Sequence, residues 1–164
     1  MDLLLEAAGM LKDRTDREFS IRLAGRGPLR KEMEQLSSAL GVSDRVHFLG
    51  RLSREKMQAE LQAANCFVLP SRYEAFGAVL IEAMATGLPV IATRSGGPDS
   101  IVTGENGILV EADRAEALAY AMEKMMEDYA AYDQATIRKY AMESYGASRV
   151  LEQYDRLFHE LLQS

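Results

Sequence analysis

Short apolar segments alternate along this chain with longer segments of helical periodicity, and this alternation constrains the fold more than any other feature. The apolar segments are residues 19–24, 46–49, 66–69, 90–93 and 107–110. Between them, apolar side chains recur every three or four residues, as they do on the buried face of a helix. Strands that alternate with helices predict parallel βαβ units covered on both faces. We therefore predict an α/β fold built on a doubly wound parallel sheet.

The individual segments carry signals for where elements begin and end. Residues 66–69 are apolar throughout and are followed by Pro70, so we expect a strand that is buried on both faces. Ser53 is expected to cap the helix that follows it. The 164 residues suffice for one domain, residues 1–164, with C-terminal helices at about 131–162. Helices are expected at residues 2–13, 28–40, 53–64, 77–86, 114–127, 131–143 and 147–162.

Charge and composition exclude several classes of function. The net charge of −6 argues against a broad nucleic-acid-binding surface. No apolar run approaches the roughly 18 residues that a membrane span needs, and the N-terminus does not resemble a signal peptide. Cys66 is the single cysteine, which suits the reducing cytoplasm. Together with two widely spaced histidines it forms no metal-ligand pattern, so no metal site is expected.

Ligands of doubly wound sheets bind beyond the carboxyl ends of the strands, so the segments that follow the strands are the candidate binding segments. In the first, Gly25 and Gly27 permit a tight turn and the close approach of a ligand, although an ordinary turn would look the same. Another, residues 93–99, contains the paired Gly96 and Gly97, which would bring backbone amides to a sugar or phosphate. It too reads equally well as a plain turn into a short helix.

The segment 70–85 is the most informative, because a loop leads there into the N-terminus of an apolar helix. Free amides and the helix dipole at such a terminus favour an anion such as a diphosphate, and Gly77 removes a side chain at the point of approach. Glu82 interrupts a helix that we expect to be buried nearly all round, so its carboxylate requires a partner or a ligand. Taken singly, Glu82 fits a structural ion pair and Glu74 a solvated loop charge. Together they suit a ligand that carries both hydroxyl and phosphate groups.

These residues resemble the signature of the group 1 glycosyltransferases, a family that includes glycogen and sucrose synthases. Its mark is two glutamates separated by seven residues, which Glu74 and Glu82 match. Further matches in family order and spacing cover most of the chain, at residues 23–28, 46–50, 96–98 and 105–110. The resemblance implies the C-terminal, donor-binding half of a GT-B fold. It also implies retaining transfer from a nucleotide-diphosphate sugar, without a metal ion or other cofactor.

The resemblance also implies roles for single positions. Glu82 would accept hydrogen bonds from the ribose, and Glu74 would position the transferred sugar. The remaining substrate-binding positions that we expect are Ala75, Phe76 and Gly77 near the sugar, Ala78 and Val79 near the diphosphate, Gly50 and Arg51 near the base, and Gly25, Gly27, Arg72, Gly96 and Gly97 around them.

The same resemblance implies that parts of the family pattern lie outside this sequence. They are the opening strand, an Arg and a Lys that contact the diphosphate, and the whole acceptor domain. Arg26 and Arg72 are nearby cations but do not occupy those two motif positions. We expect the chain to be inactive alone, with its acceptor, and any contact with a membrane surface, left to the absent domain. The last helix normally packs on that domain, so Leu157, Phe158 and Leu161 are expected to lack their packing partner.

Two other functions fit parts of the pattern. A sugar-nucleotide epimerase would share the Rossmann frame and a diphosphate site, but it would not be expected to carry the Glu74–Glu82 spacing. A non-catalytic binding module would explain exposed apolar helix faces. The donor nucleotide, the sugar and the oligomeric state do not follow from the sequence.

Overall fold

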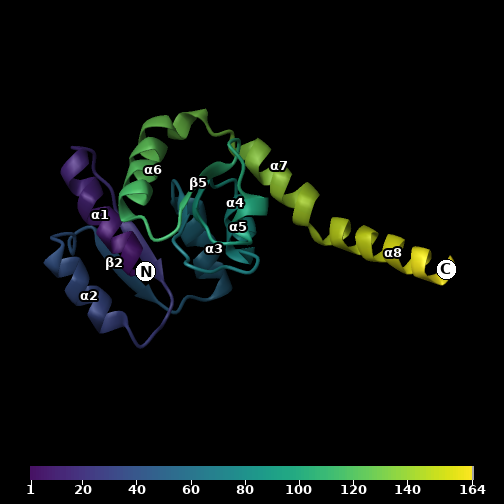
Figure 1. Cartoon of the computed structure of the whole chain (residues 1–164), viewed down its shortest axis with the longest axis horizontal. Coiled ribbons are helices and arrows are strands. Elements are labelled where there is room, and N and C mark those ends of the chain that lie inside the picture. Colours follow the sequence, from purple (N-terminus) through teal and green to yellow (C-terminus); the bar gives the residue numbers. More distant parts are fainter. Residues whose placement is uncertain (164) are drawn as a thin grey trace.

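Five parallel strands form two sheets in the computed structural model, which describes residues 1–163 (Figure 1). Strands β1 (Ile21–Ala24) and β2 (Val46–Gly50) pair with each other. Strand β4 (Val90–Arg94) lies between β3 (Phe67–Leu69) and β5 (Gly107–Glu111). Every pairing between strands is parallel, as the alternation of strands and helices predicts.

The two sheets are separate, and β3 lies at the edge of the three-stranded sheet. Each of the three residues of this edge strand is only half buried. The prediction that this segment is buried on both faces is wrong, because a fully apolar sequence does not reveal whether a neighbouring strand is present.

One face of the sheets is covered by α1, α2 and α6, and the other by α3, α4, α5 and α7. Successive side chains of β4 point to opposite faces, so Ile91 joins the first core while Val90 and Ala92 join the second. The helices of the first face are α1 (Asp2–Arg14), α2 (Arg30–Ala39) and α6 (Ala115–Asp128). Those of the second are α3 (Arg54–Ala63), α4 (Ala78–Ala85), α5 (Pro98–Ile101) and α7 (Gln134–Tyr145).

Most helix boundaries fall within a few residues of their predicted positions. Ser53 caps α3 as expected, since its hydroxyl accepts a hydrogen bond from the Lys56 amide at 3.3 Å. The helix predicted from residue 131 begins later, because a short 3₁₀ turn, η1 (Tyr129–Ala131), precedes it. Asp133 then caps α7 by accepting from the amide of Ala135 at 3.1 Å.

Helix α8 (Ala147–Gln163) projects from the body of the molecule as an arm (Figure 1). Residues 147–162 are all exposed, among them the apolar Leu151, Leu157 and Phe158. Among the described residues 1–163, no helix has the length and apolarity that crossing a membrane would require.

Candidate functional site

The loops that follow β3 and β4 pair with each other through their backbones. Glu74 donates its amide hydrogen to the Ser95 carbonyl at 3.0 Å, and Gly97 donates to the Glu74 carbonyl at 2.7 Å. Glu74 and Gly96 thereby form a parallel bridge that continues the sheet beyond its strands. Two segments singled out in the sequence, residues 70–77 and 95–97, are thus brought together at the carboxyl edge.

The paired glycines allow this close approach. A Cβ atom on Gly97 would lie 2.2 Å from the Phe76 carbonyl oxygen, a distance that backbone atoms cannot accommodate. Gly96 has a φ of 115°, which side-chain-bearing residues rarely adopt, and its Cβ would lie 3.0 Å from the Glu74 carbonyl oxygen. Both glycines, predicted as binding residues, therefore have a packing role in holding the loop that carries Glu74.

The Glu74 carboxylate lies at the N-terminus of α4. Its Oε1 atom accepts hydrogen bonds from the amides of Gly77 at 3.0 Å and Phe76 at 3.3 Å. Gly77 precedes the helix with a left-handed φ of 91°, a conformation that favours glycine. The side chain of Glu74 thus holds the loop that leads into α4, a role that the sequence pattern does not reveal.

Helix α4 has a buried side and an exposed side. Leu80, Ala83 and Met84 are buried, and these pack in the core beneath the sheet. The residues of the exposed side are Ala78, Val79 and Glu82. The expectation that this helix is buried nearly all round is wrong, because its apolar composition does not show that only one side has a packing neighbour. Glu82 needs no ion-pair partner in this exposed position.

The exposed side of α4 gathers several predicted positions on one surface. Glu82 follows Ala78 by four residues and Val79 by three, so the three share a helix face. Ala78 and Val79 are the first residues of α4, and their amides have no acceptor within the helix. Ala75 and Phe76 are also exposed beside this end. The arrangement offers two free amides, the Glu82 carboxylate one turn along and the Glu74 carboxylate in the loop before the helix.

A second group of predicted residues lies at the carboxyl edge of the other sheet. The Gly25 amide donates to the Gly50 carbonyl at 2.8 Å, so these two positions meet. Both have a positive φ, 133° for Gly25 and 71° for Gly50. Gly27 and Arg51 are exposed, and a Cβ atom on Gly27 would meet nothing within 4 Å. This region is open, whereas the loops that follow β3 and β4 are tightly packed.

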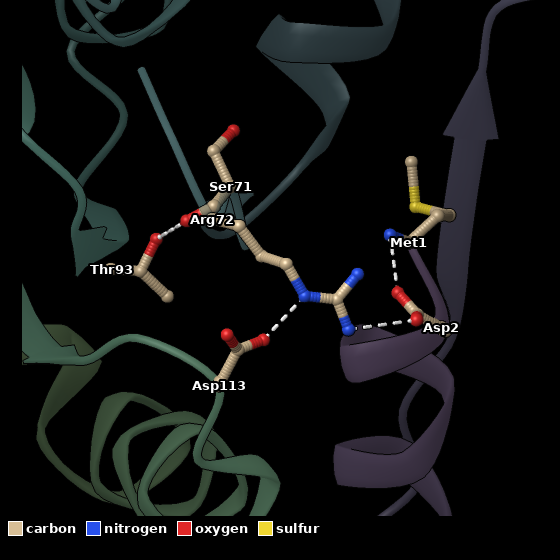
Figure 2. A network of polar contacts seen from close by, with 6 residues as sticks. All are labelled: Met1, Asp2, Ser71, Arg72, Thr93 and Asp113. Atoms are coloured by element: carbon tan, nitrogen blue, oxygen red, sulfur yellow. Dashed lines mark hydrogen bonds and ion pairs between the residues drawn. The ribbon is translucent and has the colours of Figure 1, made fainter.

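Arg72 lies between two carboxylates in the structure (Figure 2). Its Nε donates to Asp113 at 2.5 Å and its Nη2 donates to Asp2 at 3.0 Å. The pKa of the Asp2 carboxyl is lowered to about 2, first by the hydrogen bond from the N-terminal ammonium and second by the bond from Arg72. Neither aspartate stands out in the sequence. The signal available was their position, beside a helix start and just after a strand end.

Tyr145 of α7 is a further neighbour of the site that the sequence did not indicate. Its ring contacts the Phe76 ring edge-on, with centroids 6.1 Å apart. Burial, together with a hydrogen bond to Tyr140, raises the pKa of Tyr145 to about 12. Helix α7 therefore supports the loop that precedes α4. Within residues 1–163, no three His, Cys, Asp or Glu side chains gather in a way that would hold a metal ion.

The arrangement of these loops can be compared with known proteins. Residues 1–143 match the family model described as glycosyl transferases group 1. The chain belongs to this family. The match covers all five strands and both predicted glutamates. The resemblance drawn from the Glu74–Glu82 spacing and the glycine segments is thereby confirmed at the level of the family.

Relatives of this group 1 glycosyltransferase chain are longer than it is. It is 36% identical over 132 residues to the D-inositol 3-phosphate glycosyltransferase of Corynebacterium diphtheriae, covering 77% of this chain and 31% of that protein. Alpha-D-kanosaminyltransferase of Streptomyces kanamyceticus is 34% identical over 129 residues, covering 78% and 33%. The chain thus spans about a third of the length of these relatives.

Solved structures confirm the GT-B type of fold for this glycosyltransferase chain. Sucrose-phosphate synthase from Thermosynechococcus elongatus superposes with a TM-score of 0.82 at 31% identity, covering 98% of this chain and 42% of that one. HepE from Anabaena, in complex with UDP, gives a TM-score of 0.77 at 27% identity, covering 99% and 44%. The likeness extends over nearly the whole of this chain.

Proposed function

We propose that this chain binds the nucleotide-diphosphate sugar donor of a retaining glycosyltransferase. The observation that carries the proposal is the N-terminal end of α4, where two free amides lie on one surface with Glu82 and beside the carboxylate of Glu74. The structures of HepE, solved with UDP and with UDP-glucose, support it. Family membership favours transfer over epimerisation of a sugar nucleotide.

The proposed roles follow the spacing along α4. The amides of Ala78 and Val79 donate to the diphosphate, which the positive end of the helix dipole also attracts. Glu82 lies one turn further along, roughly 5–6 Å up the axis, where its carboxylate accepts from ribose hydroxyls. Glu74, whose carboxylate already accepts from the amides of Phe76 and Gly77, also accepts from hydroxyls of the transferred sugar. The open turns around Gly27 and Arg51 receive the base.

The proposed catalysis is electrostatic and uses no metal ion. Charge develops on the diphosphate as the bond to the sugar breaks, and preorganised amides and cations stabilise that charge. Arg26 forms no ion pair within residues 1–163, which leaves it available for this purpose. Glu74 acts here as a group that positions the sugar, not as a nucleophile.

The acceptor site belongs, in this proposal, to the part of the relatives that this chain does not span. The isolated chain should then bind a donor without transferring its sugar. In the longer protein, transfer should proceed in EDTA and retain the anomeric configuration. Inversion of configuration, or loss of transfer in EDTA that added Mg²⁺ restores, would count against this mechanism. The single thiol favours a location in the cytoplasm.

Amide-resolved NMR of the chain, titrated with UDP, GDP and ADP, tests donor binding. Saturable shifts at residues 76–79 for one nucleotide are expected, and Glu82→Gln should weaken them. Glu116→Gln, an exposed glutamate of α6, serves as the control that should bind normally. A well-dispersed spectrum that no nucleotide or nucleotide sugar changes would contradict the proposal.

A further inference from the structure

The loop between β3 and α4 is fixed on both sides of Arg72. On the N-terminal side, the buried Thr93 hydroxyl donates to the Ser71 carbonyl (Figure 2). On the C-terminal side, the backbone of Glu74 is bonded to Ser95 and Gly97 of the neighbouring loop. Only Arg72 and the exposed Tyr73 lie between these two attachments, and Tyr73 is 94% exposed. Within residues 72–73, the side chain of Arg72 therefore makes the contacts with the rest of the molecule.

Arg72 joins three elements that are distant in sequence. Its guanidinium contacts Asp2, in the first turn of α1, and Asp113, in the turn between β5 and α6. The two partners are 70 and 41 residues away along the chain. Asp113 has a φ of 55°, which for a residue other than glycine is uncommon, and its carboxylate reaches Arg72 from that conformation. All three residues lie at the edge that carries the candidate site.

We propose that Arg72 is a positioning residue, which sets the loop carrying Glu74 against α1 and the β5–α6 turn. The inference deepens the proposed function, because the same loop forms the proposed sugar site. Arg72 acts through the backbone at residues 74–77 and not by contacting the donor. Its one positive charge already faces two negative ones, so it is a weaker candidate than Arg26 for stabilising the leaving diphosphate.

The geometry of the guanidinium distinguishes this role from simple charge neutralisation. Arg72 uses Nε for one carboxylate and Nη2 for the other, and the planar group fixes the angle between them. A lysine has a single ammonium on a flexible stem, so it keeps the charge but does not fix that angle. Because both ion pairs are exposed, their contribution to global stability is small. The effect of losing them should therefore be local.

Donor-free NMR spectra of the full chain test the inference. In Arg72→Gln and Asp113→Asn, the amides of residues 74–77 should shift and exchange faster with solvent, while the thermal midpoint changes little. Arg72→Lys should show the same local changes despite its charge. Arg14→Gln is the matched control, because Arg14 also joins α1 to another element through an exposed ion pair, with Glu123 at 2.9 Å.

The outcome in donor-free protein decides the inference. Unchanged amides at residues 74–77 in Arg72→Gln would overturn it, as would equal changes in Arg14→Gln. If Arg72→Lys left the amides of residues 74–77 as they are in the unaltered chain, the claim that the planar guanidinium is required would be wrong. Titration with UDP is a separate step, in which the Arg72 variants should bind several-fold more weakly. If the unaltered chain binds no nucleotide or nucleotide sugar, the proposed function fails while the donor-free spectra still decide the role of Arg72.

Discussion

The loops beyond β3 and β4 differ from those beyond β1 and β2 in how their glycines are used. Gly97 lies against the backbone of Phe76, where a Cβ atom would be 2.2 Å from the carbonyl oxygen. Gly25 and Gly27 have open space at the corresponding position. Both sets look alike in the sequence, as small residues after a strand. The glycines beyond β3 and β4 therefore allow two loops to pack together, whereas those beyond β1 and β2 leave open space beside the backbone.

The largest effect expected is that of Gly97→Ala. The added methyl must force the two loops apart, and overpacking of this kind costs about 1–3 kcal/mol or more. The midpoint of thermal unfolding should fall, and nucleotide binding should weaken with it. Gly104→Ala is the control, because its Cβ would meet nothing within 4 Å. Equal thermal midpoints for Gly97→Ala and Gly104→Ala would contradict the close packing of Gly97 on which the comparison rests.

Loss of the Glu74 carboxylate should have the next largest effect. Glu74→Ala leaves the amides of Phe76 and Gly77 without their acceptor, and the loss of a hydrogen bond of this kind costs about 1 kcal/mol. Urea unfolding measures the difference in free energy. Glu74→Gln retains an acceptor oxygen, so its loss should be smaller. An unchanged stability in Glu74→Ala would contradict the role of this carboxylate in holding the loop.

Cys66, which immediately precedes β3, gives a prediction that depends on pH. Burial raises the pKa of this thiol from its ordinary value of 9.0 to about 12. The folded state therefore keeps a proton that the unfolded state loses, so this contribution to stability is complete below pH 9 and is lost as pH rises toward 12. The loss should be about 1 kcal/mol per pH unit in that window.

Comparison of the unaltered chain with Cys66→Ala separates the contribution of this thiol to stability from the contributions of other titrating groups. The stability difference between the two proteins should narrow as pH rises from 9 toward 11. In the native state the thiol should also resist alkylation at pH 8, because the thiolate is the reactive form. Rapid alkylation of the folded chain would show that the residue before β3 is more open than the structure indicates.

Gly27→Ala should have the smallest effect on folding. Its Cβ would meet nothing within 4 Å, so the free energy of unfolding should stay within about 0.5 kcal/mol of the unaltered chain. Nucleotide affinity should fall nevertheless if this turn lies against the base. A destabilisation as large as that of Gly97→Ala would show that the open region is packed after all.

Much of the fold follows from local patterns in the sequence. Each of the five predicted strands is present, and Ser53 caps α3 as its position before a helical segment predicts. The spacing of Glu74 and Glu82 led to the family that the comparison confirms. These predictions are correct because periodicity, capping and motif spacing depend on residues within one or two turns of each other.

Other features of the site depend on neighbours that no local pattern contains. The sequence predicts a helix at residues 77–86 but not that Glu82 lies on its exposed side. It indicates a charged loop, but Arg72 meets its two partners across 41 and 70 residues. The half-buried state of β3 likewise depends on its place at the edge of the three-stranded sheet.

The sequence by itself determined which segments are strands and helices, and which residue types follow each strand. Those properties are set by side-chain periodicity and backbone preference, which act over a few residues. Tertiary structure alone decided that the backbone of Glu74 pairs with the loop after β4, that Gly97 is a packing residue and that Arg72 joins α1 to the β5–α6 turn. The physical reason is that hydrogen bonds, ion pairs and close backbone approaches depend on distances in space, and parallel strands bring their carboxyl ends together from distant parts of the chain.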